Sequence, residues 1–286
     1  MAASTAALSG ITKQYKDFTL GPVDMTVPAG SIVGLIGENG AGKTTLLKIL
    51  CGVNRADDGT VDLLGGSPAD AATRAKIGVV FEDAFFYGSF TAAQVARSLA
   101  GMYGARWNAD SFSAYLRRFG LDAGKKLKEY SRGMRLKLSL AAALAHDPEL
   151  LVLDEATAGL DPVVRGELLD LFLEFIQDER HSIVMSSHIT ADLEQIADSI
   201  AYLHNGQLLF QENKDDLLQE YGVLHCGEDV LTSLPAGLVV FTRRGAYGCE
   251  SLVRERRTVQ ELLPEAVCDA ARLDDIMRFY SGRDAQ

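Results

Sequence analysis

Hydrophobic residues gather along this chain in two patterns that predict different secondary structures. Short runs that are apolar throughout and rich in branched residues are typical of strands buried in a parallel sheet. Such runs lie at residues 32–36, 77–81, 150–153 and 182–185. Longer stretches in which apolar residues have helical spacing lie at residues 92–103, 109–119, 133–145 and 163–177. Because the two kinds of segment alternate, we expect an α/β fold built on a parallel sheet.

The pattern changes near residue 216, where shorter elements follow one another. We expect strands at residues 237–242 and 247–253 and a closing helix at residues 270–280. One face of that helix carries large apolar residues, namely Leu273, Ile276, Met277 and Tyr280. We therefore divide the chain into a domain at residues 1–215 and a small accessory α+β region at residues 216–286, which we expect to pack mainly on itself. Before this boundary, Asn205-Gly206 between two strand-like runs predicts a tight hairpin turn.

A glycine-rich segment follows the first buried run. Residues 37–44 fit the pattern G-x-x-x-x-G-K-T, and a helical pattern begins directly after them. Glycines let successive backbone N–H groups turn toward one phosphate, and the following helix directs its positive end at the same anion. In such a loop the lysine, here Lys43, contacts two phosphates, and the next residue, Thr44, ligates Mg²⁺. The candidate nucleotide-binding residues are Gly37, Glu38, Asn39, Gly40, Ala41, Gly42, Lys43, Thr44 and Thr45.

Two acidic residues, Asp154 and Glu155, end the apolar run at residues 150–153. The carboxyl end of this strand is expected at the sheet edge that also carries the glycine-rich loop. Asp154 is therefore a candidate Mg²⁺ ligand. Because side chains alternate along a strand, we expect Glu155 to turn the other way, toward the water that attacks the γ-phosphate. Together with the loop, this pair predicts hydrolysis of a nucleoside triphosphate, with Glu155 as general base.

Composition excludes several other classes of function. The formal net charge of −11 argues against nucleic acid as the main partner. The four cysteines show no C-x-x-C spacing, so neither a zinc site nor a disulfide framework is predicted, and reduced thiols are expected. No run reaches the roughly 18 apolar residues that can cross a bilayer, and the N-terminus lacks the basic flank of a secretory signal. We expect a chain that is soluble by itself and that reaches a membrane only through another protein.

Seven short motifs, taken in order over roughly residues 8–215, resemble those of the ATP-binding subunit of an ABC transporter. Two are the glycine-rich loop and the acidic pair, which resembles the Walker-B motif of that family. The others are the aromatic residue Tyr15, the Q-loop residue Glu82, the signature motif Tyr130-Ser131-Arg132-Gly133-Met134, the D-loop Ala158-Gly159-Leu160-Asp161 and the switch histidine His188.

This resemblance implies the fold of an ABC ATPase core, with a small antiparallel β subdomain and a helical subdomain at about residues 84–148. It implies that Tyr15 stacks on adenine, that Glu82 takes part in Mg²⁺ binding, and that His188 contacts the γ-phosphate and orients Glu155. Lys43, Glu155 and His188 are then the catalytic residues, and Asp161 joins the nucleotide contacts.

The resemblance also implies partners and a location. Two such subunits, identical or different, close head to tail over ATP, so that Ser131 and Gly133 reach the nucleotide bound by the other subunit. A separate membrane-spanning subunit holds the pair in the cytoplasm at the inner face of the cell membrane. Export is favoured, because the Q-loop and signature sequences resemble bacterial subunits that pair with ABC-2-type membrane proteins.

The chain departs from the family pattern at three positions. Glu82 stands where glutamine is usual, and Arg132 and Met134 stand where glycine and glutamine are commoner. Ser131, Gly133 and Glu155 are intact, so both sites of a homodimer are expected to be competent.

Two rival functions share part of this pattern. Residues 62–65 fit D-x-x-G and residues 213–216 fit N-K-x-D, which are GTPase patterns, but the second lies beyond the expected nucleotide site and the first is expected in an edge strand and its turn. Non-transport ABC ATPases of the translation or repair type carry two cores in one chain or long coiled coils. This chain has one core and no sustained heptads.

Overall fold

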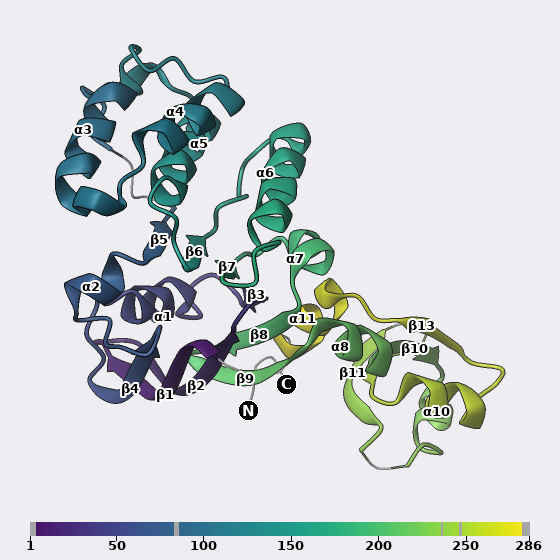
Figure 1. The fold of residues 1–286 in the computed structure, drawn as a ribbon. Helices are drawn as coiled ribbons and strands as arrows, with labels where there is room; N and C mark the ends of the chain where they lie inside the picture. The colour runs from purple at the N-terminus through teal and green to yellow at the C-terminus, as the bar shows by residue number, and fades with distance from the viewer. Residues whose placement is uncertain (1–3, 83–85, 236, 246–247, 282–286) are drawn as a thin grey trace.

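The computed structural model describes residues 4–82, 86–235, 237–245 and 248–281 (Figure 1). A central sheet organises the chain. Its strands are β3 Ile32–Ile36, β5 Ile77–Val80, β6 Leu150–Asp154, β7 Ser182–Ser186, β8 Ser199–His204 and β9 Gln207–Asn213. They lie in the order β5-β6-β7-β3-β8-β9, and the neighbours are parallel except for the final antiparallel pair of β8 and β9. The four buried strands expected from the sequence are therefore confirmed.

Two antiparallel sheets flank the central one. The first has the order β2-β1-β4 and contains β1 Ser4–Gln14, β2 Thr19–Pro28 and β4 Asp58–Leu63. The second has the order β11-β12-β10-β13 and contains β10 Gly222–Cys226, β11 Val239–Gly245, β12 Gly248–Val253 and β13 Val267–Ala270. The expected strands at residues 237–242 and 247–253 correspond to β11 and β12, although residue 247 lies outside the described residues.

Helices connect these strands. Within the described ranges they are α1 Lys43–Leu50, α2 Ala71–Arg74, α3 Ala92–Tyr103, α4 Ala109–Arg118, α5 Arg132–Leu144, α6 Pro162–Phe175, α7 Thr190–Ile196, α8 Lys214–Glu220, α9 Glu228–Leu231, α10 Arg256–Leu262 and α11 Leu273–Ser281, with short 3₁₀ turns at Gly104–Arg106 and Leu127–Glu129. The four longer helices expected from apolar spacing, now α3 to α6, are confirmed to within two residues at each end. Asn205 and Gly206 both have positive φ, 45° and 80°, in the turn between β8 and β9, as the hairpin prediction requires.

The side chains of the central strands alternate between two apolar cores. On β6, Leu151 and Leu153 face the core shared with α5, α6 and α7, while Leu150 and Val152 face the core shared with α1 and the β2-β1-β4 sheet. Each strand is buried on both faces, which explains why these runs are apolar throughout. Asp154, two residues beyond Val152, consequently lies on the α1 side of the sheet.

Helices α3, α4 and α5 form a separate layer that stands above the central sheet in Figure 1. They have their own apolar cluster, which includes Phe112, Leu127, Tyr130 and Leu138. This is the segment expected as a helical subdomain from about residue 84, but residues 84 and 85 lie outside the described residues.

The C-terminal region packs on the central core as well as on itself, which corrects the sequence expectation. One cluster, which includes Leu224 and Val259, belongs to this region alone. The apolar face of α11, however, joins the main core beside α7, and the ring of Tyr280 lies 5.6 Å from that of Tyr202 on β8. The buried face of α11 also differs from expectation. It includes Phe279, whereas Met277 is only half-buried.

Candidate active site

A cavity of about 260 Å³ lies at the carboxyl ends of β3 and β6. It is lined by Phe18, Glu38, Asn39, Gly40, Gly42, Lys43, Thr44, Thr45, Glu82 and Glu155. Gly42 precedes α1 with a φ of 105°, and a Cβ there would lie 2.8 Å from Cζ of Phe18. Both facts require glycine at this position. Gly37 and Ala41 do not line the cavity: Gly37 lies against the backbone of Leu203, and Ala41 packs in the core beneath the loop.

Lys43 is the buried cation of this cavity. Its Nζ donates to the carbonyl oxygens of Gly37 at 2.7 Å and Glu38 at 3.3 Å. The same atom lies 3.4 Å from Oε1 of Glu155, and the Lys43 side chain is only 6% exposed. Two carbonyls of the glycine-rich loop therefore hold the ammonium group. The backbone N–H groups of this loop and the start of α1 surround it, and both favour the binding of an anion.

Asp154 is buried and accepts two side-chain hydrogen bonds. The Thr44 hydroxyl donates to Oδ2 at 2.8 Å, and the Ser186 hydroxyl donates to Oδ1 at 2.6 Å. Two oxygen ligands on adjacent corners of an Mg²⁺ octahedron lie about 2.9 Å apart, given metal–oxygen distances of about 2.0–2.1 Å. The separation and the chemistry of the Thr44 and Asp154 oxygens therefore fit Mg²⁺.

Glu155 faces this cavity, but a backbone turn, and not the alternation of side chains along a strand, directs it there. β6 ends at Asp154, and Glu155 adopts a left-handed backbone with φ of 52°. Its N–H is held by the carbonyl oxygen of Ser186 at 3.1 Å and the hydroxyl of Ser186 at 3.0 Å. This turn brings the Glu155 carboxylate between Lys43 and His188, whose Nδ1 lies 2.6 Å from Oε2. The expected partners thus meet, but through a backbone turn and not through alternation.

Glu82 lines the cavity from the segment after β5, and it makes an ion pair with Arg132 at 2.9 Å. Both side chains are about half-exposed, so this pair contributes little to stability. The pair does place a positive guanidinium group next to the negative carboxylate of Glu82 at this cavity.

The other residues of the expected site lie at helix starts. Ser131 precedes α5, where its Oγ accepts from the N–H of Met134 at 3.2 Å and keeps its own hydrogen to donate. Neither Ser131 nor Gly133 lines the cavity of its own chain.

Asp161 caps α6 by accepting from the N–H groups of Val163 and Val164. The roles of Ser131, Gly133 and Asp161 toward a second subunit stay predictions.

Two neighbouring aromatic residues, Tyr15 and Phe18, differ in their relation to the cavity. Tyr15 is 42% exposed and its ring lies 6.4 Å from that of Phe18, in the turn between β1 and β2. Phe18 lines the cavity and Tyr15 does not. The contact of Phe18 with the glycine-rich loop depends on how β1 and β2 pack over α1, so the sequence alone missed it.

Ser186 is the other residue that sequence reasoning missed. It is fully buried at the end of β7 and contacts both acidic residues, through the side chain of Asp154 and the backbone of Glu155. Its position opposite Asp154 follows from the pairing of β6 with β7, which are 28 residues apart along the chain. A serine ending an apolar strand next to Ser187-His188 is the signal that could have suggested it.

The GTPase patterns have structural explanations. The side chain of Asn213 caps α8 by accepting from the N–H groups of Asp215 and Asp216, and residues 62–65 end the edge strand β4 and its turn, as expected. Neither segment lines the cavity.

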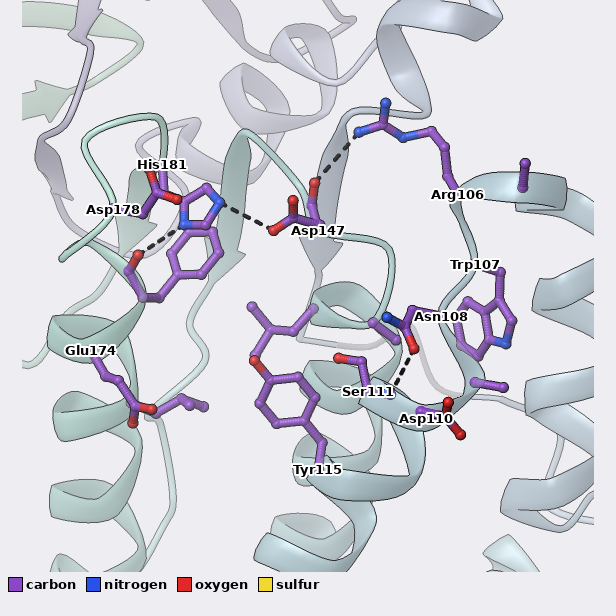
Figure 2. Close-up of a pocket in the computed structure, with 16 residues that line it drawn as sticks. Arg106, Trp107, Asn108, Asp110, Ser111, Tyr115, Asp147, Glu174, Asp178 and His181 are labelled. Atoms are coloured by element: carbon purple, nitrogen blue, oxygen red, sulfur yellow. Dashed lines mark hydrogen bonds and ion pairs between the residues drawn. The ribbon is translucent and has the colours of Figure 1, made fainter.

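A larger cleft, of about 740 Å³, lies elsewhere, between α4, α5 and α6 (Figure 2). Asp147 precedes β6 and His181 precedes β7, so this cleft is at the amino edge of the central sheet. Three of the four carboxylates that line it pair with arginine or histidine, and the fourth is Asp110. Glu174 pairs with Arg118 at 2.6 Å, Asp178 with Arg180 at 2.6 Å, and Asp147 with His181 at 3.3 Å. It contains none of the predicted nucleotide-binding residues.

Comparisons with known proteins indicate one family. A model of the ABC transporter family matches residues 20–158. Over 207 residues the chain is 38% identical to an uncharacterised ABC transporter ATP-binding protein of Synechocystis, covering 70% of this chain and 58% of the relative. Over 212 residues it is 36% identical to the bacitracin transport ATP-binding protein of Enterococcus faecalis, covering 72% of this chain and 68% of the relative.

Solved structures show the same likeness. A structure of an ATP-binding subunit of an ABC transporter aligns with a TM-score of 0.68 and 28% identity, over 75% of this chain and 92% of the other. Among the described residues, no helix has both the length and the apolar character needed to cross a membrane.

Proposed function

Because this chain belongs to the family of ABC transporter ATP-binding proteins, we propose that it binds ATP with Mg²⁺, hydrolyses it and powers a transporter whose membrane-spanning part is a separate chain. One observation carries the proposal. The Glu155 carboxylate lies between Lys43 and His188 in the cavity that also contains Thr44, whose hydroxyl contacts Asp154.

Each side chain has a task in this proposal. Backbone N–H groups of the glycine-rich loop and the start of α1 bind the phosphates, and Lys43 adds the positive charge that offsets them. Thr44 and Asp154 would hold Mg²⁺, which neutralises charge on the phosphate oxygens when it is bound.

Glu155 accepts the proton of the attacking water. His188 keeps the carboxylate in place through Nδ1, and also through its backbone N–H, which lies 3.3 Å from Oε2. Only 11% of the Glu155 side chain is exposed, so its carboxylate is largely shielded from bulk water.

The assembly and the location are also proposals. We infer two such subunits closing head to tail, with Ser131 and Gly133 completing the site of the neighbour, on the cytoplasmic face of a membrane protein. The donor hydrogen left on Ser131 and its place at the start of a 13-residue helix support this assignment. Residues 1–215 would form the ATPase unit and residues 216–286 an accessory region packed on it. Export is favoured by the Q-loop and signature sequences.

Glu155→Gln tests the proposal most directly. We expect ATP binding to persist and phosphate release to fall by at least about 100-fold, since a positioned base contributes about 10²–10⁴. With Mg²⁺ and ATP, gel filtration should show a shift from monomer to dimer, because the nucleotide that joins the subunits is no longer consumed.

A matched control is Glu174→Gln, which removes a carboxylate from the larger cleft and should leave hydrolysis unchanged. Hydrolysis by Glu155→Gln near the wild-type rate would overturn its assignment as base. Intact ATP binding with no shift to dimer would overturn self-pairing but not hydrolysis.

A further inference from the structure

The C-terminal sheet places two cysteines directly opposite each other. Strands β10 and β12 are antiparallel neighbours, and their register pairs Cys226 with Cys249. Both are free thiols; Cys249 is buried and Cys226 is half-buried. Both also line a cavity of about 510 Å³ on this sheet, so small solutes can reach them.

The geometry of such a pair suits a disulfide. Directly opposed residues of an antiparallel pair have Cα atoms about 4.5–5.5 Å apart, inside the range of about 4.4–6.8 Å found across disulfides. Their Cβ atoms lie about 4.5–5.5 Å apart against about 3.5–4.5 Å in a disulfide, so the strands need to approach by no more than about 1 Å.

A third cysteine of the same sheet is placed differently. Cys268 on β13 lies opposite Leu224, which puts it diagonal to Cys226. A Cβ on Gly222 would lie 2.9 Å from the Cys268 sulfur, so this sulfur leans toward Gly222 and away from Cys226. Cys268 therefore provides an internal control within the same sheet.

We propose that Cys226 and Cys249 are a redox-sensitive dithiol, which peroxides oxidise to an intrachain disulfide. The more exposed Cys226 thiolate attacks one peroxide oxygen, giving a sulfenic acid and releasing water. The Cys249 sulfur then attacks the sulfenic sulfur and expels the second oxygen as water, forming the S–S bond. In sum, two thiols and one hydrogen peroxide give one disulfide and two waters, and a thiol reductant restores the dithiol.

The disulfide would cross-link two strands of the C-terminal region, which also carries α11. β12 also holds Glu250, which lies 3.0 Å from Arg278 on α11, and α11 packs against the central core. A bond between β10 and β12 would therefore fix the sheet on which this helix rests. Burial raises the pKa of Cys226, with the neighbouring Cys249 adding to the effect, so oxidation should be faster at pH 9 than at pH 7.

Peptide mapping of the reduced full-length protein, before and after hydrogen peroxide, tests the proposal. Remaining thiols are alkylated under denaturing conditions and the protein is digested with trypsin. The four cysteines fall in four different tryptic peptides, residues 49–55, 215–243, 245–254 and 258–272. We expect peptides 215–243 and 245–254 to become linked, the intact mass to fall by two hydrogen atoms, and a thiol reductant to reverse both changes.

Single cysteine variants distinguish the formation of this disulfide from unspecific oxidation of the cysteines. Cys226→Ser and Cys249→Ser should each abolish the linked peptide, whereas Cys268→Ser should form it as the wild type does. The proposal is overturned if peroxide only adds oxygen to separate peptides, if Cys268 or Cys51 forms the link, or if non-reducing electrophoresis shows a link between two chains. The wild-type map alone decides these outcomes, so a variant that misfolds leaves the test intact.

Discussion

The two edges of the central sheet carry similar side chains, yet only one edge has the buried cation and the glycine-rich loop on which the proposed phosphate site rests. At the carboxyl edge, the buried Lys43 and the shielded Glu155 line a cavity of about 260 Å³, and the buried Asp154 is hydrogen-bonded to Thr44 of its lining. At the amino edge, a cleft of about 740 Å³ carries four carboxylates, of which three pair with arginine or histidine; Figure 2 shows the pair of Asp147 and His181. Cavity size therefore does not locate the site, whereas burial and convergence of charged groups do.

Helix direction explains the difference between the edges. β3 leads through the glycine-rich loop into the start of α1, where unpaired backbone N–H groups attract an anion. At the amino edge, α5 and α6 end shortly before β6 and β7, so backbone carbonyls face the cleft. There His181 Nδ1 lies 3.0 Å from the carbonyl oxygen of Phe175, and Arg106 donates to that of Asp147 at 3.4 Å. Carbonyl oxygens at the amino edge thus accept from side-chain donors, and the start of α4, which also lines this cleft, is capped by the Asn108 side chain.

Replacing the buried Lys43 should have the largest effect, because it removes the buried positive charge that distinguishes the carboxyl edge from the amino edge. We expect Lys43→Ala to weaken ATP binding by about 10- to 100-fold, because a charge-assisted hydrogen bond contributes about 1.5–3 kcal/mol. Lys76→Ala is the matched change at the amino edge, where Lys76 lies 3.4 Å from Glu149 on the protein surface. It should leave ATP affinity unchanged. Equilibrium binding of a fluorescent ATP analogue measures both, and equal affinities in the two variants would contradict the assignment of Lys43.

Sequence patterns predicted most of the fold and the residue types of the site, for physical reasons that particular elements show. Strands such as β6 are apolar throughout because both their faces are buried, and the hairpin turn at Asn205-Gly206 is fixed by local backbone preference. Such signals are local, so a sequence displays them.

Long-range contacts could not be predicted in this way. Ser186 meets Asp154 only because β7 pairs with β6, and Phe18 meets Gly42 only because one sheet packs over α1. Glu155 shows a local failure, since its left-handed backbone interrupts the alternation on which its direction was predicted. The α11 face was misjudged because Phe279 finds its partners in the central core.

Two serines of β7 allow the carboxyl and amino edges of the sheet to be compared within one strand. Ser186 at the carboxyl end and Ser182 at the amino end are both fully buried and hydrogen-bonded. Ser186→Ala should lower kcat and the apparent affinity for Mg²⁺ by about 10-fold, because Asp154 loses a partner that orients it.

Ser182→Ala should instead lower the free energy of unfolding by about 1–3 kcal/mol, since the Thr5 hydroxyl loses its buried partner, and should leave kcat unchanged. Steady-state kinetics over a range of Mg²⁺ concentrations and urea unfolding separate the two effects. A loss of kcat in Ser182→Ala, or none in Ser186→Ala, would show that the two ends of β7 do not divide stability from catalysis.

A buried histidine beside the amino edge gives the smallest predicted effect. His146 precedes Asp147, stacks on Tyr103 at 4.1 Å, and has Nε2 within 3.0 Å of the Ile77 carbonyl oxygen. Burial lowers the pKa of His146 below its usual value of 6.5. The folded state therefore favours neutral His146, so this contribution to stability is complete above pH 6.5 and is lost as the pH falls from there through the lowered pKa.

Urea unfolding at several pH values between 7 and 5 measures this contribution. His146→Gln should have a lower free energy of unfolding than the wild type at pH 7. This difference in free energy should become smaller as the pH falls, because only His146 of the wild type takes up a proton on unfolding. If the difference in free energy of unfolding between His146→Gln and the wild type did not change with pH, the folded state would not hold His146 neutral. The amino edge would then not exclude a buried positive charge at this position.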